Sequence, residues 1–184
     1  MAWIDPNQVP KRTLSTGEQI PCIGMGTFGS DRFTAEQISN AVAGAIRCGY
    51  RMFDCASVYG NEDQIGQVFA DAFQEGIVKR EELFIASKVW NDMHWKGDVL
   101  LSCAQTLKDL QLDYLDAYFV HWPFANYHAP GCDGDSRNPD SKPFKVEDFM
   151  ITWRQMERLY DMGLVHNLGM SSTVSYTHLT LPTK

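Results

Sequence analysis

Apolar residues recur with two different spacings along this chain, and the spacing predicts its elements. Apolar positions three or four residues apart predict four helices, over residues 35–48, 62–74, 98–110 and 146–162. Short apolar runs between them predict strands, over residues 20–24, 50–54, 83–88, 115–121 and 164–170. Most of these runs lack a polar alternation, which is typical of parallel strands covered on both faces.

Turn and capping residues support these boundaries. The sequence Ser-Thr-Gly at residues 15–17 predicts the turn of a short hairpin within residues 11–24. Thr34 and Gln37 have the spacing of a capping box at the start of the first helix. Gly49 follows this helix, at a position where glycine is favoured because the backbone turns left-handed.

The predicted strands end at regular intervals. Their carboxyl ends fall near Gly24, Asp54, Lys88, His121 and Gly169, which are 30, 34, 33 and 48 residues apart. The longest interval contains a polar segment, residues 125–145, of a length that usually serves a function such as a lid. Repeated strand–helix units predict a parallel sheet, either doubly wound or closed as a (β/α)8 barrel.

The length favours part of a barrel. The chain has 184 residues, and a complete (β/α)8 barrel needs about 200 or more. The fold class we predict is therefore α/β, an incomplete (β/α)8 TIM barrel over residues 1–173, with a hairpin, about four βα units and a fifth strand. Residues 174–184 show no helical apolar period, so we expect them to be foreign to the fold.

Composition narrows the classes of function. Hydrophobic residues make up 44% of the chain and charged residues 21%, which is ordinary for a globular protein. The net charge of −7 argues against a nucleic-acid partner, whose binding surface would be basic. No apolar run has the length of a membrane span and no signal peptide is recognisable, so we expect no membrane association. The five cysteines form no CxxC pair, which favours free thiols in the cytoplasm over disulfides or a bound metal.

Four polar residues lie at or just after predicted carboxyl ends of strands: Asp54, Tyr59, Lys88 and His121. In a parallel barrel these ends converge on one mouth, where active sites lie. A cationic Lys88 beside Tyr59 would stabilise the phenolate and make Tyr59 a better proton donor, while Asp54 would hold the lysine. His121 can donate a hydrogen bond to a carbonyl oxygen, so the set suits a reaction in which such an oxygen gains charge. Because side chains cannot supply a hydride, a reduction would require a cofactor.

A glycine-rich segment, GMGTFG at residues 24–29, allows two interpretations. It matches the GxGxxG pattern of a Rossmann dinucleotide site. That site requires a helix to open within the glycines, whereas here the sequence SDRF separates them from the helix that Thr34 caps. We therefore favour a loop whose glycines let another group approach the backbone.

Several motifs together resemble the aldo-keto reductase family. They are GMGTFG (24–29), GYRMFDCASVYGNE (49–62), IASKVWND (85–92), YFVHWP (118–123) and HNLGMSS (166–172). The resemblance spans about residues 11–173. It implies a (β/α)8 barrel that binds NADPH, or less often NADH, and reduces aldehydes and ketones to alcohols.

The resemblance also implies roles for individual residues. Tyr59 would be the general acid of a catalytic tetrad with Asp54, Lys88 and His121. The residues expected to contact the cofactor are Gly26, Thr27, Phe28, Asp54, Ser171 and Ser172. Those expected to line the pocket for a small carbonyl substrate are Phe28, Tyr59, Trp90, His121 and Trp122.

The chain departs from the family pattern in two ways. The family commonly has Ser-Asn after the fifth strand, where this chain has Ser171 and Ser172. The family's later strands, which supply a nicotinamide-stacking tyrosine and the phosphate contacts, are not found here, so we expect the chain alone to be inactive. Two other functions stay open: a Schiff-base lyase with Lys88 as nucleophile, and a non-enzymatic binding or regulatory subunit.

Overall fold

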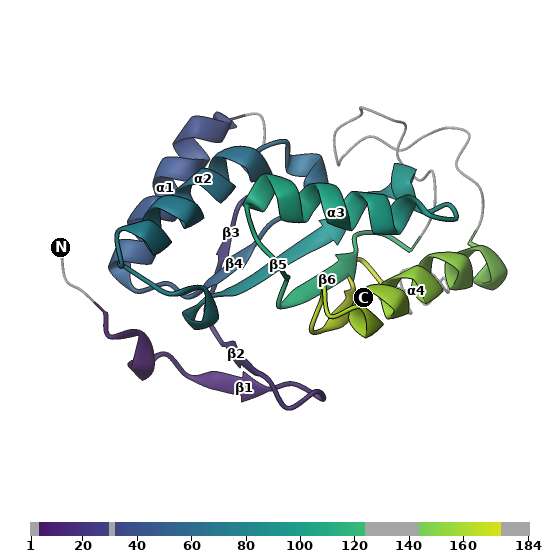
Figure 1. The fold of residues 1–184 in the computed structure, drawn as a ribbon, viewed down its shortest axis with the longest axis horizontal. Coiled ribbons are helices and arrows are strands. Elements are labelled where there is room, and N and C mark those ends of the chain that lie inside the picture. Colours follow the sequence, from purple (N-terminus) through teal and green to yellow (C-terminus); the bar gives the residue numbers. More distant parts are fainter. Residues whose placement is uncertain (1–3, 30–31, 124–143, 174–184) are drawn as a thin grey trace, which may run out of the picture.

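A five-stranded parallel sheet organises the chain (Figure 1). The computed structural model describes residues 4–29, 32–123 and 144–173; most of the predicted lid and the 174–184 tail lie outside these ranges. The sheet has the order β3-β4-β5-β6-β7, with strands Met25–Gly26, Met52–Asp54, Phe84–Val89, Ala117–Val120 and Leu168–Met170. The helices are α1 (Ala35–Cys48), α2 (Glu62–Gln74), α3 (Asp98–Leu110) and α4 (Val146–Asp161). Strands pair in chain order and neighbouring helices contact one another in chain order, as in successive units of a barrel.

The helix predictions are confirmed almost to the residue. Thr34 and Gln37 form the capping box, each side chain accepting a hydrogen bond from the other residue's backbone N–H. Gly49 ends α1 with φ of 103°, a left-handed conformation that glycine adopts without a steric penalty. Farther along, Gly66 lets α2 approach α3 closely, because a Cβ there would lie 2.0 Å from the backbone oxygen of Asp109.

The predicted strands begin too early, and the first one is displaced. The run 20–24 was expected to be a sheet strand, but Gln19–Pro21 forms β2, which pairs antiparallel with β1 (Lys11–Thr13) in the hairpin. The first sheet strand is the two-residue β3, which pairs with β4. The last strand is also shorter than expected, since it begins at Leu168 and Val165 pairs with Leu115 in an isolated bridge outside the strand. Apolar sequence alone does not separate ladder residues from the equally buried residues that lead into them.

The two faces of the sheet are covered unequally. Ile85 and Val89 of β5 point outward into the core beneath the helices, whereas Phe84 and Ala86 point to the other face. On that face Leu14 and Ile20 of the hairpin provide part of the cover. All six residues of β5 are buried, as expected for strands covered on both sides, but β4 and β7 are partly exposed. The prediction of two-sided cover therefore holds for the central strand and is wrong for β4 and β7.

The glycine-rich segment follows the loop interpretation. A Cβ on Gly24 would lie 2.8 Å from the Met52 side chain, and one on Gly29 would lie 2.9 Å from Ile38. A side chain at either position would force these neighbours to shift, so both glycines permit close packing. Gly26, by contrast, has open space around its Cα, and the amino end of α1 is already capped by Thr34.

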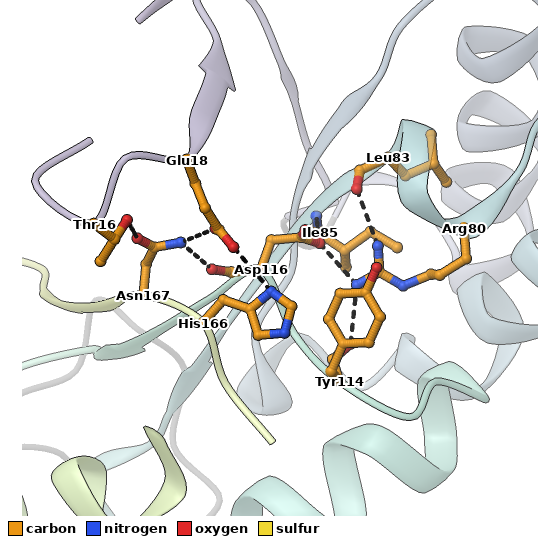
Figure 2. A network of polar contacts seen from close by, with 9 residues as sticks. All are labelled: Thr16, Glu18, Arg80, Leu83, Ile85, Tyr114, Asp116, His166 and Asn167. Atoms are coloured by element: carbon orange, nitrogen blue, oxygen red, sulfur yellow. Dashed lines mark hydrogen bonds and ion pairs between the residues drawn. The ribbon is translucent and has the colours of Figure 1, made fainter. Parts of the chain in front are cut away.

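A polar network at the amino end of the sheet ties the hairpin to β7 (Figure 2). Thr16 donates to the amide oxygen of Asn167, and the Asn167 amide donates to the Glu18 carboxylate and to the Asp116 carbonyl. The Glu18 carboxylate also lies 3.1 Å from His166 Nδ1. The contacts from Thr16 and Glu18 to Asn167 join residues about 150 positions apart in the chain.

A second part of this network holds the start of β5, through the backbone N–H of Ile85. Arg80 pairs with Asp116 at 2.7 Å, and the same carboxylate accepts the Ile85 N–H. The Tyr114 ring lies between the Arg80 guanidinium, 3.9 Å from its centroid, and the parallel His166 ring, at 4.4 Å (Figure 2). Burial raises the pKa of Asp116, and the neighbouring Arg80 opposes that shift. A cavity of about 550 Å³ borders this end of the sheet, which is opposite the end at which barrel enzymes carry out their chemistry.

Within the described ranges, no helix combines the length and the apolar character that crossing a membrane requires.

Among the described residues, Cys22, Cys55 and Cys103 are free thiols. Burial raises the pKa of Cys103 to about 12, so this thiol stays protonated at neutral pH.

Candidate active site

The four predicted catalytic residues meet at the carboxyl end of the sheet. Asp54 ends β4, Lys88 lies near the end of β5, and His121 follows β6. Tyr59 comes from a 3-10 turn, Ser57–Tyr59, directly after β4. Parallel pairing of β4, β5 and β6 brings these strand ends to one edge, so residues far apart in the sequence share one site.

Lys88 is the centre of this group. Its side chain is 8% exposed, and its Nζ lies 2.7 Å from Asp54 Oδ1, 2.8 Å from the Cys55 carbonyl oxygen and 3.4 Å from Tyr59 Oη. An ammonium has three N–H donors, and here three acceptors surround it. The arrangement places a fixed positive charge beside the Tyr59 hydroxyl.

Aromatic rings pack around the Tyr59 ring. The Tyr59 ring meets the His121 ring edge-on, with centroids 5.9 Å apart, and lies 5.0 Å from the Phe28 ring. Trp90, which is buried, packs edge-on against His121 at 4.9 Å. Tyr59 and His121 are each only half-buried, although the Nδ1 atom of His121 is itself buried.

The loop Gly26–Thr27–Phe28 forms another side of the mouth. Thr27 is fully buried, and both its N–H and its Oγ1 donate to the Asp54 carbonyl, at 3.1 and 3.0 Å. Phe28 is 60% exposed and Gly26 has open space around it. Because Thr27 has no exposed surface, the prediction of a cofactor contact in this loop rests on Gly26 and Phe28, with Thr27 holding them in place.

The two serines and the second pocket tryptophan lie next to this mouth. Ser171 follows β7 and its N–H donates to the Val120 carbonyl at 2.8 Å, which places it beside the end of β6. Ser172 has φ of 54°, in the left-handed region where asparagine is favoured among non-glycine residues. The departure from the family's Ser-Asn therefore falls at a backbone position that suits asparagine. Trp122 is half-buried directly after His121.

Two buried residues at the start of α2 escaped the sequence analysis. An asparagine directly before a helix suggests an N-cap, but Asn61 caps nothing; its Nδ2 donates to the Thr27 carbonyl at 2.9 Å. Glu62 accepts hydrogen bonds from Ser87 at 2.6 Å and Thr106 at 2.9 Å. Apart from the position of Asn61 before a helix, the sequence signal was their place in the motif ending YGNE, which carries no information about partners.

The chemistry of the site is that of an acid with a charged neighbour. No group of three or more His, Cys, Asp or Glu among the described residues is arranged to hold a metal ion. The tetrad offers a phenol, an ammonium, a carboxylate and an imidazole, which can donate a proton and stabilise the charge left behind. Behind Lys88, on the outer side of β5, burial raises the pKa of Glu62, although its two hydroxyl donors oppose that shift.

This pKa shift predicts how Glu62 affects stability. The folded state holds the Glu62 proton more tightly than the unfolded state, so between the two pKa values the free energy of unfolding falls as pH rises. Glu62→Gln cannot titrate. We expect the free energy of unfolding of Glu62→Gln, relative to the unmodified protein, to increase from about pH 4 to about pH 7, measured by urea denaturation.

Asp63→Asn provides the matched control, because Asp63 is the exposed carboxylate next in the same helical turn. Its relative stability should change little over that range. A Glu62→Gln difference that stays constant with pH, or that decreases toward neutral pH, would show that Glu62 is not destabilised by burial.

Known proteins provide an independent comparison. The sequence model of the Aldo/keto reductase family matches residues 22–178. An aldo/keto reductase from Synechocystis is 43% identical over 159 residues, which are 86% of this chain and 47% of that protein. An NADH-dependent D-xylose reductase from Candida parapsilosis is 40% identical over 173 residues, 89% of this chain and 51% of that protein.

Comparison with a solved structure points to the same family as the sequence comparisons. The crystal structure of a Bombyx mori aldo-keto reductase in complex with NADP superposes with a TM-score of 0.78 at 35% identity, covering 94% of this chain and 53% of that one. The chain thus spans about half the length of the curated relatives it matches, and its sheet is the corresponding part of a (β/α)8 barrel. By sequence and by fold, the chain belongs to the aldo/keto reductase family.

Proposed function

We propose that the protein containing this chain reduces aldehyde or ketone carbonyls to alcohols, with Tyr59 as the proton donor. The observation that carries the proposal is the contact of Lys88 Nζ with both Asp54 and Tyr59 Oη, beside the His121 ring. Family membership supports the same reaction class. Because the chain spans about half of its relatives, the activity is proposed for a protein with a complete barrel.

The cofactor we propose is NADPH, with NADH as the alternative. The similar Bombyx mori enzyme was solved with NADP, and the similar Candida parapsilosis enzyme is NADH-dependent. Gly26 leaves the backbone open to a close neighbour, and exposed Phe28 and half-buried Ser171 lie at the same edge of the sheet. These residues fit the nicotinamide end of such a cofactor, which would supply the hydride that side chains cannot.

The tetrad then supplies the proton. As the carbonyl carbon gains a hydride, its oxygen gains negative charge, and the Tyr59 hydroxyl transfers a proton to that oxygen to complete the alcohol. Lys88 stabilises the phenolate that Tyr59 becomes, and Asp54 keeps the ammonium in place at 2.7 Å. His121 and Trp90 form the wall beside Tyr59, where His121 can donate a hydrogen bond to the carbonyl oxygen.

The lyase alternative fits this geometry less well. A lysine that attacks a carbonyl must be neutral and must have a free lone pair. Lys88 instead directs its ammonium toward Asp54, Cys55 and Tyr59. No observation favours Lys88 as a nucleophile.

Replacing the proton donor tests the proposal. In the full-length protein, Tyr59→Phe should lower kcat for a reactive aromatic aldehyde by about 10²–10⁴-fold, the usual contribution of a general acid. The dissociation constant for NADPH should change little, because the substitution removes one hydroxyl group. Tyr160→Phe, at an exposed tyrosine on α4, provides the matched control and should keep full activity. A Tyr59→Phe variant that retains more than about a third of kcat would exclude Tyr59 as the acid.

The chain by itself should not turn over. β3 and β7 each leave one edge of the sheet unpaired among the described residues, and closure of a barrel is what normally removes such edges. We expect residues 1–184 to associate on size exclusion and to show no NADPH oxidation with an aldehyde, while a complete relative assayed in parallel is active. A monodisperse monomer that turns over at about 1 s⁻¹ or faster would overturn this expectation.

A further inference from the structure

Asn61 connects two parts of the candidate site: the loop proposed to face the cofactor and the segment that carries the proposed proton donor. Its Nδ2 donates to the Thr27 carbonyl at 2.9 Å, across 34 residues of sequence. Thr27 lies between Gly26 and Phe28 in the loop proposed to face the cofactor. Asn61 itself is two residues beyond Tyr59, the proposed proton donor, with only Gly60 between them. One buried amide therefore joins the cofactor loop to the segment that carries the acid.

Thr27 is held from both sides. Its N–H and its hydroxyl donate to the Asp54 carbonyl, and its own carbonyl accepts from Asn61. Thr27 is fully buried and Asn61 is 2% exposed, so water does not compete for these bonds. The bond from Asn61 connects the loop to the residue that directly precedes α2.

Asn61 is itself held rigidly. Its carbonyl accepts the Ile65 N–H in the first turn of α2 at 3.1 Å. The next residue, Glu62, is fastened to β5 by Ser87 and to α3 by Thr106. Because Asn61 adjoins Glu62, its Nδ2 donor has a defined position relative to β5, the strand that also carries Lys88.

The second polar atom of the Asn61 amide, Oδ1, has different surroundings from Nδ2. Asn61 Oδ1 is buried and, among the described residues, has no hydrogen-bond partner. A buried acceptor without a partner opposes folding, and such groups in native proteins call for an explanation. A side-chain oxygen that capped α2 from this position would accept a hydrogen bond from a backbone N–H of the first helical turn, and Asn61 Oδ1 accepts none.

We propose that Asn61 is a positioning residue that holds the Gly26–Phe28 loop in register with Tyr59, so that cofactor and proton donor meet the substrate in a fixed geometry. This inference rests on the proposed function for its catalytic meaning. The bond itself makes a prediction that does not depend on activity: without the Asn61 donor, the loop opens more often while α2 stays intact.

Two substitutions in the full-length protein test the inference, measured by hydrogen exchange and by NADPH binding. Asn61→Ala removes the donor, so the backbone amides of residues 25–29 should exchange about tenfold faster. The dissociation constant for NADPH should rise by a similar factor, with exchange in residues 66–74 of α2 unchanged. Gln67→Ala, an exposed site on the same helix, is the matched control and should leave both quantities unchanged.

Asn61→Asp provides a readout that a packing role would not give. A protonated carboxyl can still donate to the Thr27 carbonyl, whereas an ionised one is repelled by it. Relative to the unmodified protein at each pH, this variant should therefore approach normal loop exchange and NADPH affinity in acid and resemble Asn61→Ala at alkaline pH. If Asn61→Ala does not fold, this pH series still decides the question.

Several results would overturn the inference. Loop exchange in Asn61→Ala no faster than in Gln67→Ala would show that the bond does not hold the loop. Faster exchange with unchanged NADPH affinity and unchanged kcat would show that the hold has no catalytic role. An unmodified protein that binds NADPH but reduces no aldehyde would refute the proposed function separately, and the exchange and binding data would still test whether Asn61 holds the loop.

Discussion

The placement of one ammonium, Lys88 Nζ, among three acceptors is the constraint on which the candidate site depends. Asp54, the Cys55 carbonyl and Tyr59 Oη come from β4 and the turn that follows it, while Lys88 comes from β5. The three contacts require β4 and β5 to keep their parallel register, which pairs Phe53 with Ile85 and Asp54 with Ala86 beneath the outward core. The barrel geometry and the acid chemistry are thus linked through one side chain.

Much of the fold could be predicted from the sequence because its signals are local. Helical periods, the capping box at Thr34 and the glycine after α1 depend on neighbours a few residues away, and the structure places α1 as expected. The strands were harder, since β3 has only two residues and is defined by its pairing with Phe53 and Asp54 of β4, 28 positions later in the sequence. The network from Thr16 and Glu18 to Asn167 is invisible in the sequence for the same reason.

The residues of the candidate site likewise divide into those that local sequence signals predict and those that depend on distant contacts. Asp54, Lys88 and His121 could be placed together because each ends a predicted parallel strand, and parallel strands end on one edge. Thr27 is buried and its hydroxyl donates to the Asp54 carbonyl, and the Asn61 side chain donates to the Thr27 carbonyl rather than capping its helix. A residue type and a position along the chain do not specify which way a side chain turns, because that depends on packing between distant elements.

The most direct test of the central claim is the pH–rate profile of Lys88→Met in the full-length protein. The substitution keeps much of the side-chain length and removes the charge beside Tyr59. If Lys88 stabilises the phenolate, kcat at neutral pH falls by about a hundredfold or more, and the limb of the profile that reports Tyr59 moves to more alkaline pH. A variant whose profile has the shape and position of the unmodified protein's would contradict the account and leave Lys88 as a structural partner of Asp54.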